Sequence, residues 1–273
     1  MQKRKLFLIS LLCLLVVDVF VYLFQIGGQS HDLLRNILFL LGQLVTITGG
    51  IYVIREYGLN NPTGKTAAFL TGGFLLWALG SLTYVINTFF LGIDQYPSLA
   101  DVFIIAGYFF YMGGLLLEVN KRHVSFKSPY KVAVLIAGFI IGVVTFYFGF
   151  YLAIDPGAPW LVNLVSLGYG IGDVVLLMTL LIVLMMALEY KGGRLFLPWV
   201  LIFLGMLVIL IADILFTFYV AEYEAKEWPY YAGIDFIWRS AYVFFAYGLF
   251  SLGFVVKDVK GTIARTIERE VKK

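Results

Sequence analysis

Apolar residues fall into eight long runs, separated by short segments rich in glycine, proline, asparagine and charged residues. Because about 20 apolar residues in a helix cross the ~30 Å core of a bilayer, each run predicts a transmembrane helix. The runs are too long and unbroken for barrel strands, which alternate over about ten residues. The pattern therefore predicts an all-α integral membrane protein with eight transmembrane helices. The runs cover about 6–26, 36–54, 67–92, 101–118, 132–153, 160–188, 195–220 and 234–256.

The composition excludes an ordinary soluble domain. Hydrophobic residues make up 61% of the chain and charged residues 14%, with a mean hydropathy of +0.92, whereas soluble domains average about 45–50% and about 25%. We therefore expect a multi-pass protein of the cell membrane, with the lipid bilayer as its surroundings and no nucleic-acid partner. The single cysteine, Cys13, excludes an intramolecular disulfide.

Lysine and arginine are divided unequally between the two sides that eight helices imply. Seventeen of the 20 lie on the side of the two termini, Arg35 and Lys226 lie on the opposite side, and Arg239 lies within a run. Because cytoplasmic loops carry the excess of Lys and Arg, both termini are predicted to be cytoplasmic. We expect a membrane domain over 1–256 and a basic amphipathic tail over 257–273. The tail either lies on the anionic inner leaflet or docks a cytoplasmic partner.

The two halves of the membrane domain resemble each other, which predicts a 4+4 tandem repeat. YPSLAD, ending at Asp101, precedes Tyr108 by seven residues, and YYAGID, ending at Asp235, precedes Tyr242 by the same distance. Gly-Gln-Leu-Val in the second run also matches Gly-Asp-Val-Val in the sixth. Four helices return the chain to the same side, so the repeats are predicted to be parallel, related by an axis along the membrane normal. They would cover 1–130 and 131–256.

Arg239 is the one basic residue that this pattern places inside an apolar run. A charge in hydrocarbon costs at least about 2.5–3.5 kcal/mol on insertion scales, so Arg239 should face the protein interior and pair with a carboxylate. Two interpretations stay open: a lock between helices through Asp235 or Asp213, or an outward-facing polar pocket for a small molecule or ion. The pocket candidates are Arg239, Asp235, Asp213, Asp101, Tyr108, Tyr242, Asn87 and Trp238.

Three further polar residues are predicted near the middle of the membrane: Asp173, Gln43 and Asp18. Asp173 has no basic residue at its depth, so we expect it to be protonated or hydrogen-bonded to Tyr169, Gln43 or a hydroxyl. Gly-Ile-Gly-Asp173 is similar to the GxGD motif of intramembrane aspartyl proteases, in which two carboxyls activate water. The companion Tyr-Asp and Pro-Ala-Leu motifs are missing, and the candidate partner, Asp213, is predicted to lie nearer the outside.

The residues also limit cofactor chemistry. His31 and His123 lie in or beside loops, so paired haem ligands across helices are not expected. No His, Cys and Asp residues have zinc spacing, and no lysine lies in the middle of the last run to hold retinal. We therefore expect no cofactor and no metal.

Four segments resemble the multi-pass N-terminal membrane regions of bacterial signalling proteins whose cytoplasmic parts are GGDEF or EAL enzymes or histidine kinases. The resemblance covers the third to eighth runs, and it implies a sensor or anchor whose stimulus is unassigned. The sequence stops at Lys273 without an output domain, so we expect no enzymatic activity to carry over. The segments are YPSLADVFIIAGY from Tyr96, LGYGIGDVVLL from Leu167, ADILF from Ala212, and GIDFIW from Gly233 with Tyr242.

These observations favour a non-enzymatic membrane sensor or receptor-like module that binds a ligand near its outer face. It would pass the signal through the last helix to a cytoplasmic signalling partner or within a homo-oligomer. Small-solute or ion transport is the first alternative, because of the repeat and Asp173. A structural or assembly subunit is the second, and a GxGD protease is a remote third.

Overall fold

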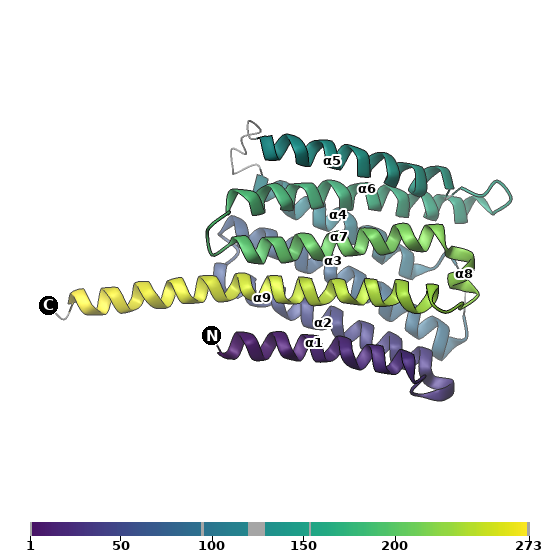
Figure 1. Ribbon diagram of the computed structural model, residues 1–273, viewed down its shortest axis with the longest axis horizontal. Helices are drawn as coiled ribbons and strands as arrows, with labels where there is room; N and C mark the ends of the chain where they lie inside the picture. The colour runs from purple at the N-terminus through teal and green to yellow at the C-terminus, as the bar shows by residue number, and fades with distance from the viewer. Residues whose placement is uncertain (1, 94–95, 120–128, 153, 272–273) are drawn as a thin grey trace.

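The computed structural model describes residues 2–93, 96–119, 129–152 and 154–271, and within these ranges the regular structure is entirely helical. Residues 272–273 of the predicted tail lie outside the described residues. Figure 1 shows the long helices lying side by side. They are α1 (Gln2–Leu23), α2 (His31–Tyr57), α3 (Pro62–Val85), α4 (Leu99–Val119), α5 (Pro129–Phe146), α6 (Trp160–Glu189), α7 (Phe196–Phe218) and α9 (Tyr230–Val271). The short elements are helix α8 (Val220–Glu224) and the segments η1 (Gly28–Ser30), η2 (Ile86–Leu91) and η3 (Tyr147–Leu152).

Among the described residues, five helical stretches are long and apolar enough to cross a membrane, which confirms the all-helical membrane class. Three shorter apolar helices occupy the remaining predicted runs, so the number of spans stays a prediction at eight. The five stretches are His31–Tyr57, Pro62–Leu91, Trp160–Glu189, Phe196–Phe218 and Tyr230–Glu270, and the shorter three are Phe7–Leu23, Leu99–Gly114 and Ile136–Phe146.

Local signals in the sequence set where the helices begin and end. Gly58, with a φ of 77°, closes α2 through a bond from its amide to the Ile54 carbonyl. The Asn61 side chain then accepts a hydrogen bond from the Thr63 amide at 2.9 Å and caps α3, whose first residue is Pro62. A proline at this position fits because the first helical amide has no partner in the helix.

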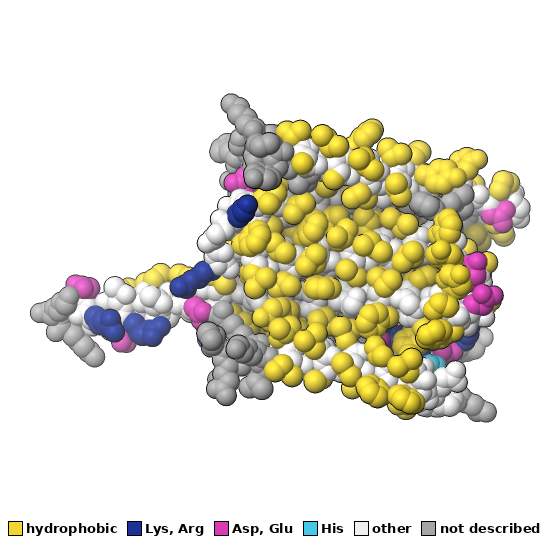
Figure 2. All heavy atoms as spheres, in the orientation of Figure 1, with side chains coloured by type: hydrophobic (Ala, Val, Ile, Leu, Met, Phe, Trp, Pro, Cys, Tyr) yellow, Lys and Arg dark blue, Asp and Glu magenta, His cyan; other side chains and the backbone are white. Residues whose placement is uncertain are grey.

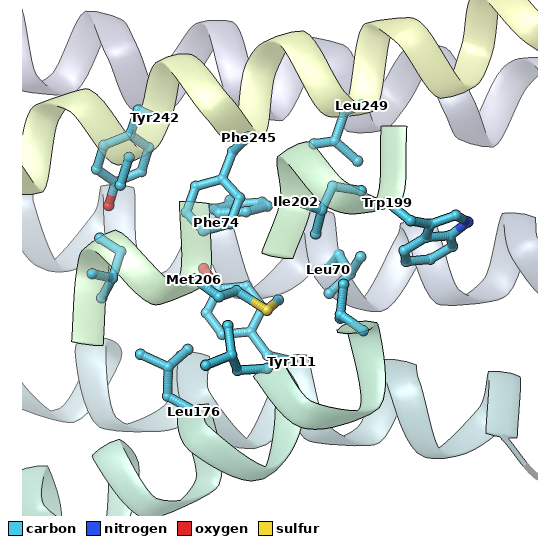
Figure 3. Packing of buried hydrophobic residues seen from close by; sticks show 14 of the residues in the cluster. Leu70, Phe74, Tyr111, Leu176, Trp199, Ile202, Met206, Tyr242, Phe245 and Leu249 are labelled. Atoms are coloured by element: carbon cyan, nitrogen blue, oxygen red, sulfur yellow. The ribbon is translucent and has the colours of Figure 1, made fainter. Parts of the chain in front are cut away.

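The core lies where α3, α4, α6, α7 and α9 meet (Figure 3). The rings of Phe74 and Phe245 lie 4.7 Å apart, and Phe245 is fully buried. A Cβ atom at Gly205 would come within 2.7 Å of the Phe245 ring, so the absence of a side chain there lets α7 approach α9. Gly73 opens the same kind of space for the Tyr111 ring between α3 and α4. Small residues permit such close approach of membrane helices.

Apolar side chains cover the flanks of the bundle, and charge gathers at its two ends (Figure 2). The end where α2 meets α3 and α6 meets α7 carries Arg55, Lys65, Lys191 and Arg194, and we call it the basic end. The opposite end, where α7 meets α9, carries Glu222, Glu224 and Glu227, and we call it the acidic end. An apolar belt between charged ends is the surface that a bilayer requires.

Helix α9 runs through the bundle from the acidic end and continues well beyond the basic end (Figure 1). Its 42 residues correspond to about 63 Å at 1.5 Å per residue. The described part of the predicted tail, 257–271, is therefore an unbroken continuation of α9. It is exposed, including the apolar Val259, Ile263 and Ile267. Lys260 anchors its start by donating a hydrogen bond to the Glu56 carbonyl.

Candidate functional site

Arg239 is buried and bound by two carboxylates, as a guanidinium inside a bilayer requires. Its Nη1 donates to Asp18 of α1, and its Nη2 lies 3.5 Å from Asp235, one turn earlier on α9. Of the partners predicted for Arg239, Asp235 is confirmed. Asp213 lies in a different group of residues, described below. Asp18 is a partner that the sequence did not indicate, and it joins α1 to α9.

Arg35 corrects the sequence interpretation, which placed it in an outer loop and treated Arg239 as the one basic residue within the helices. Helix α2 begins at His31, so Arg35 lies in its second turn, and it is only 1% exposed. Its guanidinium donates to the Asp235 carboxylate and to the Tyr22 hydroxyl, and it donates to Asp32 at 3.0 Å. Asp235 therefore lies between two buried guanidiniums, Arg35 and Arg239.

Aromatic rings enclose the Arg35 guanidinium on both faces. Its Cζ lies 4.1 Å from the centroid of the Tyr22 ring and 4.0 Å from that of Tyr231. A ring face attracts a cation, and the attraction strengthens when water is excluded. The two tyrosine hydroxyls also donate to acids of the same group, Tyr22 to Asp235 and Tyr231 to Asp32. The rings thus hold the cation while their hydroxyls hold its counter-ions.

Positive and negative charges balance in this group, which we call the guanidinium network. Its cations are Arg35, Arg239 and Lys226, and its anions are Asp18, Asp32 and Asp235. Lys226 is 62% exposed and closes the network at the surface through a 2.6 Å contact with Asp32. A buried charge is tolerated when it is paired and hydrogen-bonded. The network therefore ties α1, α2 and α9 together at the acidic end.

Tyr223 of the short helix α8 completes the shell around Asp235. Its hydroxyl donates to the second oxygen of Asp235 at 2.7 Å. Burial, followed by the neighbouring Asp235 carboxylate, raises the pKa of the Tyr223 hydroxyl well above its usual range. Tyr223 therefore stays protonated and acts as a donor at neutral pH.

Two polar atoms of the network are buried without a hydrogen-bond partner among the described residues: Oδ2 of Asp18 and Nε of Arg35. Asp18 and Arg239 also line a small cavity of about 30 Å³ between α1 and the neighbouring α2 and α9. That volume accommodates a water molecule. The network thus keeps one acceptor and one donor with which an incoming polar group can bond.

A second group, the acid triad, lies between α4, α6 and α7. The Tyr108 hydroxyl lies 3.4 Å from an oxygen of Asp173 and 3.4 Å from an oxygen of Asp213. The two carboxyls therefore flank one hydroxyl from neighbouring helices, Asp173 from α6 and Asp213 from α7. The prediction that Asp213 lies nearer the outside than Asp173 is wrong, because both flank the same hydroxyl. Trp238 of α9 donates to Asp213 at 2.7 Å.

A third group, the amide triad, has the same form with neutral side chains. The Gln43 amide nitrogen donates to the Ser81 hydroxyl at 3.0 Å and to the Tyr242 hydroxyl at 3.1 Å. Gln43 lies on α2, Ser81 on α3 and Tyr242 on α9. The predicted pocket residue Tyr242 therefore accepts a hydrogen bond from Gln43, and no described hydrogen bond joins it to Arg239, although it lies one turn after Arg239 on α9.

The remaining candidates have local roles. Asp101 accepts from the amide of Ser98 at 2.6 Å, and the Ser98 hydroxyl accepts from Ala100, so the pair forms a capping box at the start of α4. Asp101 also accepts from the Tyr169 hydroxyl at 2.7 Å. The Asn87 carbonyl accepts bonds that end η2. Neither residue is brought to Arg239 by any described contact.

Trp238 links the guanidinium network to the acid triad. Its ring centroid lies 6.0 Å from that of Tyr223, which donates to Asp235. Its indole nitrogen donates to Asp213. Within the described residues, no group of three His, Cys, Asp or Glu side chains is arranged to hold a metal ion.

Sequence reasoning missed Arg35, Tyr22, Asp32, Tyr223 and Tyr231 as members of a site. The signal was present for Arg35, because a basic residue four positions after a helix start lies inside the helix. It was treated instead as the charge that ends a loop. Tyrosines are common at the membrane interface, so their presence near helix ends does not by itself indicate a site. Comparison of this chain with protein-family models, with curated proteins and with solved structures finds no match.

Proposed function

We propose that this chain is a multi-pass membrane sensor or receptor-like module whose stimulus acts on the guanidinium network. The main support is that Asp235 and Arg239 lie in the first three turns of α9. The same unbroken helix continues into the exposed tail, as far as Val271. Because every turn of a continuous helix is hydrogen-bonded to the next, a shift at one end is passed along it to the other. The tail then presents the change to a cytoplasmic partner or to a second copy of the chain.

Because its charges are balanced, the network can respond to a charged or polar ligand by changing conformation. A polar ligand that takes one guanidinium or one carboxylate as its partner leaves the opposite charge unpaired, and the helices must move to pair it again. The partnerless Asp18 oxygen and Arg35 nitrogen are the first contacts available to such a ligand. The proposal places the acidic end outside and both termini in the cytoplasm, in keeping with the basic residues near the termini.

The proposed architecture is eight transmembrane helices in two parallel four-helix halves. The two triads support it: Gln43, Ser81 and Tyr242 of the amide triad correspond, at an offset of about 130 residues, to Asp173, Asp213 and Tyr108 of the acid triad. In each triad the tyrosine comes from the other half of the chain: α2 of the first half contacts α9 of the second, and α6 of the second half contacts α4 of the first. Such an exchange is expected of two repeats related by a two-fold axis.

The test of the sensor proposal combines ligand screening with a readout at the tail. Purified protein is screened against small anions and metabolites by thermal unfolding. Each ligand that raises the unfolding temperature is tested again on Asp235→Asn, which keeps the side-chain shape and removes the charge. We expect the response to be lost in Asp235→Asn and kept in Asp155→Asn, a matched change in an exposed loop at the same end. Equal responses in both variants would contradict the proposal.

Transmission is measured separately. Spin labels on single cysteines at Val259 in the tail and Lys191 in the α6–α7 loop, in a Cys13→Ala background, report their distance by electron paramagnetic resonance. Asp235→Asn is expected to shift or broaden that distance distribution, because Arg35 and Arg239 lose their shared carboxylate. Identical distributions in wild type, Asp235→Asn and Asp155→Asn would show that the network does not act on the tail.

Ion- or proton-coupled transport is a second candidate, and the acid triad favours it. Two carboxyls beside one hydroxyl inside the bundle form a group that can bind and release a cation. Vesicles that contain the wild-type protein and carry a pH-sensitive dye are expected to show proton movement that Asp173→Asn reduces strongly. Ser81→Ala, the matched change in the amide triad, should leave it intact. Cleavage of a membrane peptide that needs both Asp173 and Asp213 would favour the protease hypothesis instead.

A further inference from the structure

A cavity of about 390 Å³ lies at the basic end of the bundle, remote from the guanidinium network and the acid triad. It is formed by two loops that lie far apart in the sequence, the α2–α3 turn and the α6–α7 turn. The first contributes Tyr57, Asn61 and Thr63, and the second contributes Tyr190 and Leu195. The volume lies within the range of small-molecule sites, about 300–1,000 Å³.

Trp199 of α7 lines this cavity and has an unused hydrogen-bond donor. The residue is 1% exposed, yet its Nε1 has no hydrogen-bond partner among the described residues. Figure 3 shows the indole nitrogen pointing away from the packed cluster, on the side where α9 leaves the bundle. Leaving a buried N–H without a partner is unfavourable, so the site favours a group that accepts this hydrogen bond.

Basic residues lie in or beside the two turns that form the cavity, close in sequence to the residues that line it. Arg55, Lys65, Lys191 and Arg194 are all exposed, and each lies within two positions of a residue that lines the cavity. Glu56, next to Tyr57 in the sequence, has its carboxylate 3.7 Å from Nζ of Lys260, so its negative charge is paired with the tail. Basic side chains combined with N–H and hydroxyl donors recognise phosphate, whose oxygens accept several hydrogen bonds at once.

We infer that this cavity is a binding site for a phosphate-bearing ligand, held by the Trp199 indole and the basic side chains of the two turns, with its remaining part against the Tyr57 and Tyr190 rings. The ligand is either a soluble phosphorylated molecule or the phosphate headgroup of a lipid in the facing leaflet. The site does not depend on the proposed sensor function. It lies beside the contact between Glu56 and Lys260, where the tail begins.

The test uses the full chain labelled with 5-fluorotryptophan, so that each indole gives its own fluorine resonance. The Trp199 and Trp160 resonances are assigned from Trp199→Phe and Trp160→Phe. Trp160 is 74% exposed at the opposite end of the bundle and is the internal control. Pyrophosphate is added to protein in a neutral detergent, with sodium chloride of equal ionic strength as the reference. In a second arm, nanodiscs of phosphatidylcholine are compared with nanodiscs that also contain phosphatidic acid.

We expect a saturable shift of the Trp199 resonance and no shift of the Trp160 resonance. A shift with pyrophosphate assigns a soluble ligand, and a shift in the phosphatidic acid nanodiscs alone assigns a lipid headgroup. The double variant Lys65→Gln with Arg194→Gln should bind about tenfold or more weakly, because two charged hydrogen-bond donors for phosphate are lost. Both changes are at exposed sites, and its thermal unfolding checks that it folds. No saturable shift in either arm, or an equal shift in the double variant, overturns the inference.

Discussion

Replacing Arg35 with alanine is expected to lower the free energy of unfolding by about 3–5 kcal/mol, the cost of removing one partner from a buried ion pair. Arg35 is 1% exposed, and without it the Asp235 carboxylate keeps only Arg239 as a nearby guanidinium. The Tyr22 and Tyr231 rings also lose the cation between them. Unfolding in mixed neutral and anionic detergent micelles, followed by circular dichroism, measures the change.

Lys226→Ala is the matched control, because it removes a cation of the same network at the surface. The Lys226 side chain is 62% exposed, so its pair with Asp32 should contribute less than about 1 kcal/mol. The double variant Arg35→Met with Asp235→Leu should recover part of the stability, since no unpaired carboxylate then remains at that position. If Arg35→Ala lowers the free energy of unfolding no more than Lys226→Ala does, the buried ion pairs do not hold α1, α2 and α9 together.

Phe245→Ala is expected to destabilise the bundle by about 3–5 kcal/mol, because truncating a buried aromatic residue leaves a cavity. Phe245 packs on Phe74 at 4.7 Å between ring centroids and fills the space beside Gly205. Its loss separates α9 from α3 and α7. The same unfolding measurement applies, with the retention of helical signal before unfolding as a check on the starting state.

Phe139→Ala serves as the control for Phe245→Ala. Phe139 lies on α5 and is 73% exposed, so its ring faces the surroundings of the bundle. In lipid, removing an outward ring leaves no internal cavity, and we expect a change below about 1 kcal/mol. Equal costs for the two truncations would contradict the packing of α9 against α3 and α7.

Phe245 and Phe139 show that the sequence of a membrane helix does not reveal which of its faces is buried. In a soluble helix, polar residues mark the exposed face, whereas here both faces are apolar because lipid covers the outside. Periodicity therefore predicted where helices lie along the chain but could not orient them. The glycines of α3 and α7 are a partial signal, since close approach requires them, but their ring partners come from other helices.

The candidate site was predicted in part. Arg239, Asp235 and the need for a carboxylate partner followed from the cost of a charge in hydrocarbon. Asp18 was predicted near the middle of the membrane but not as a partner of Arg239, which it contacts from α1. Asp173 was expected to have a hydroxyl partner, and Tyr108 provides it. That Asp213 lies beside it required the packing of α6 against α7.

The sequence by itself determined the class of this protein, because the length and polarity of a helix that crosses hydrocarbon are set by the solvent and are visible locally. It also determined that Arg239 must have an acid beside it. Only the tertiary structure decided which acids these are, that Arg35 lies between the Tyr22 and Tyr231 rings, and that two distant turns enclose the cavity under Trp199. Such pairings depend on the rotation of each helix about its axis. An all-apolar helix leaves that rotation free until its neighbours pack against it.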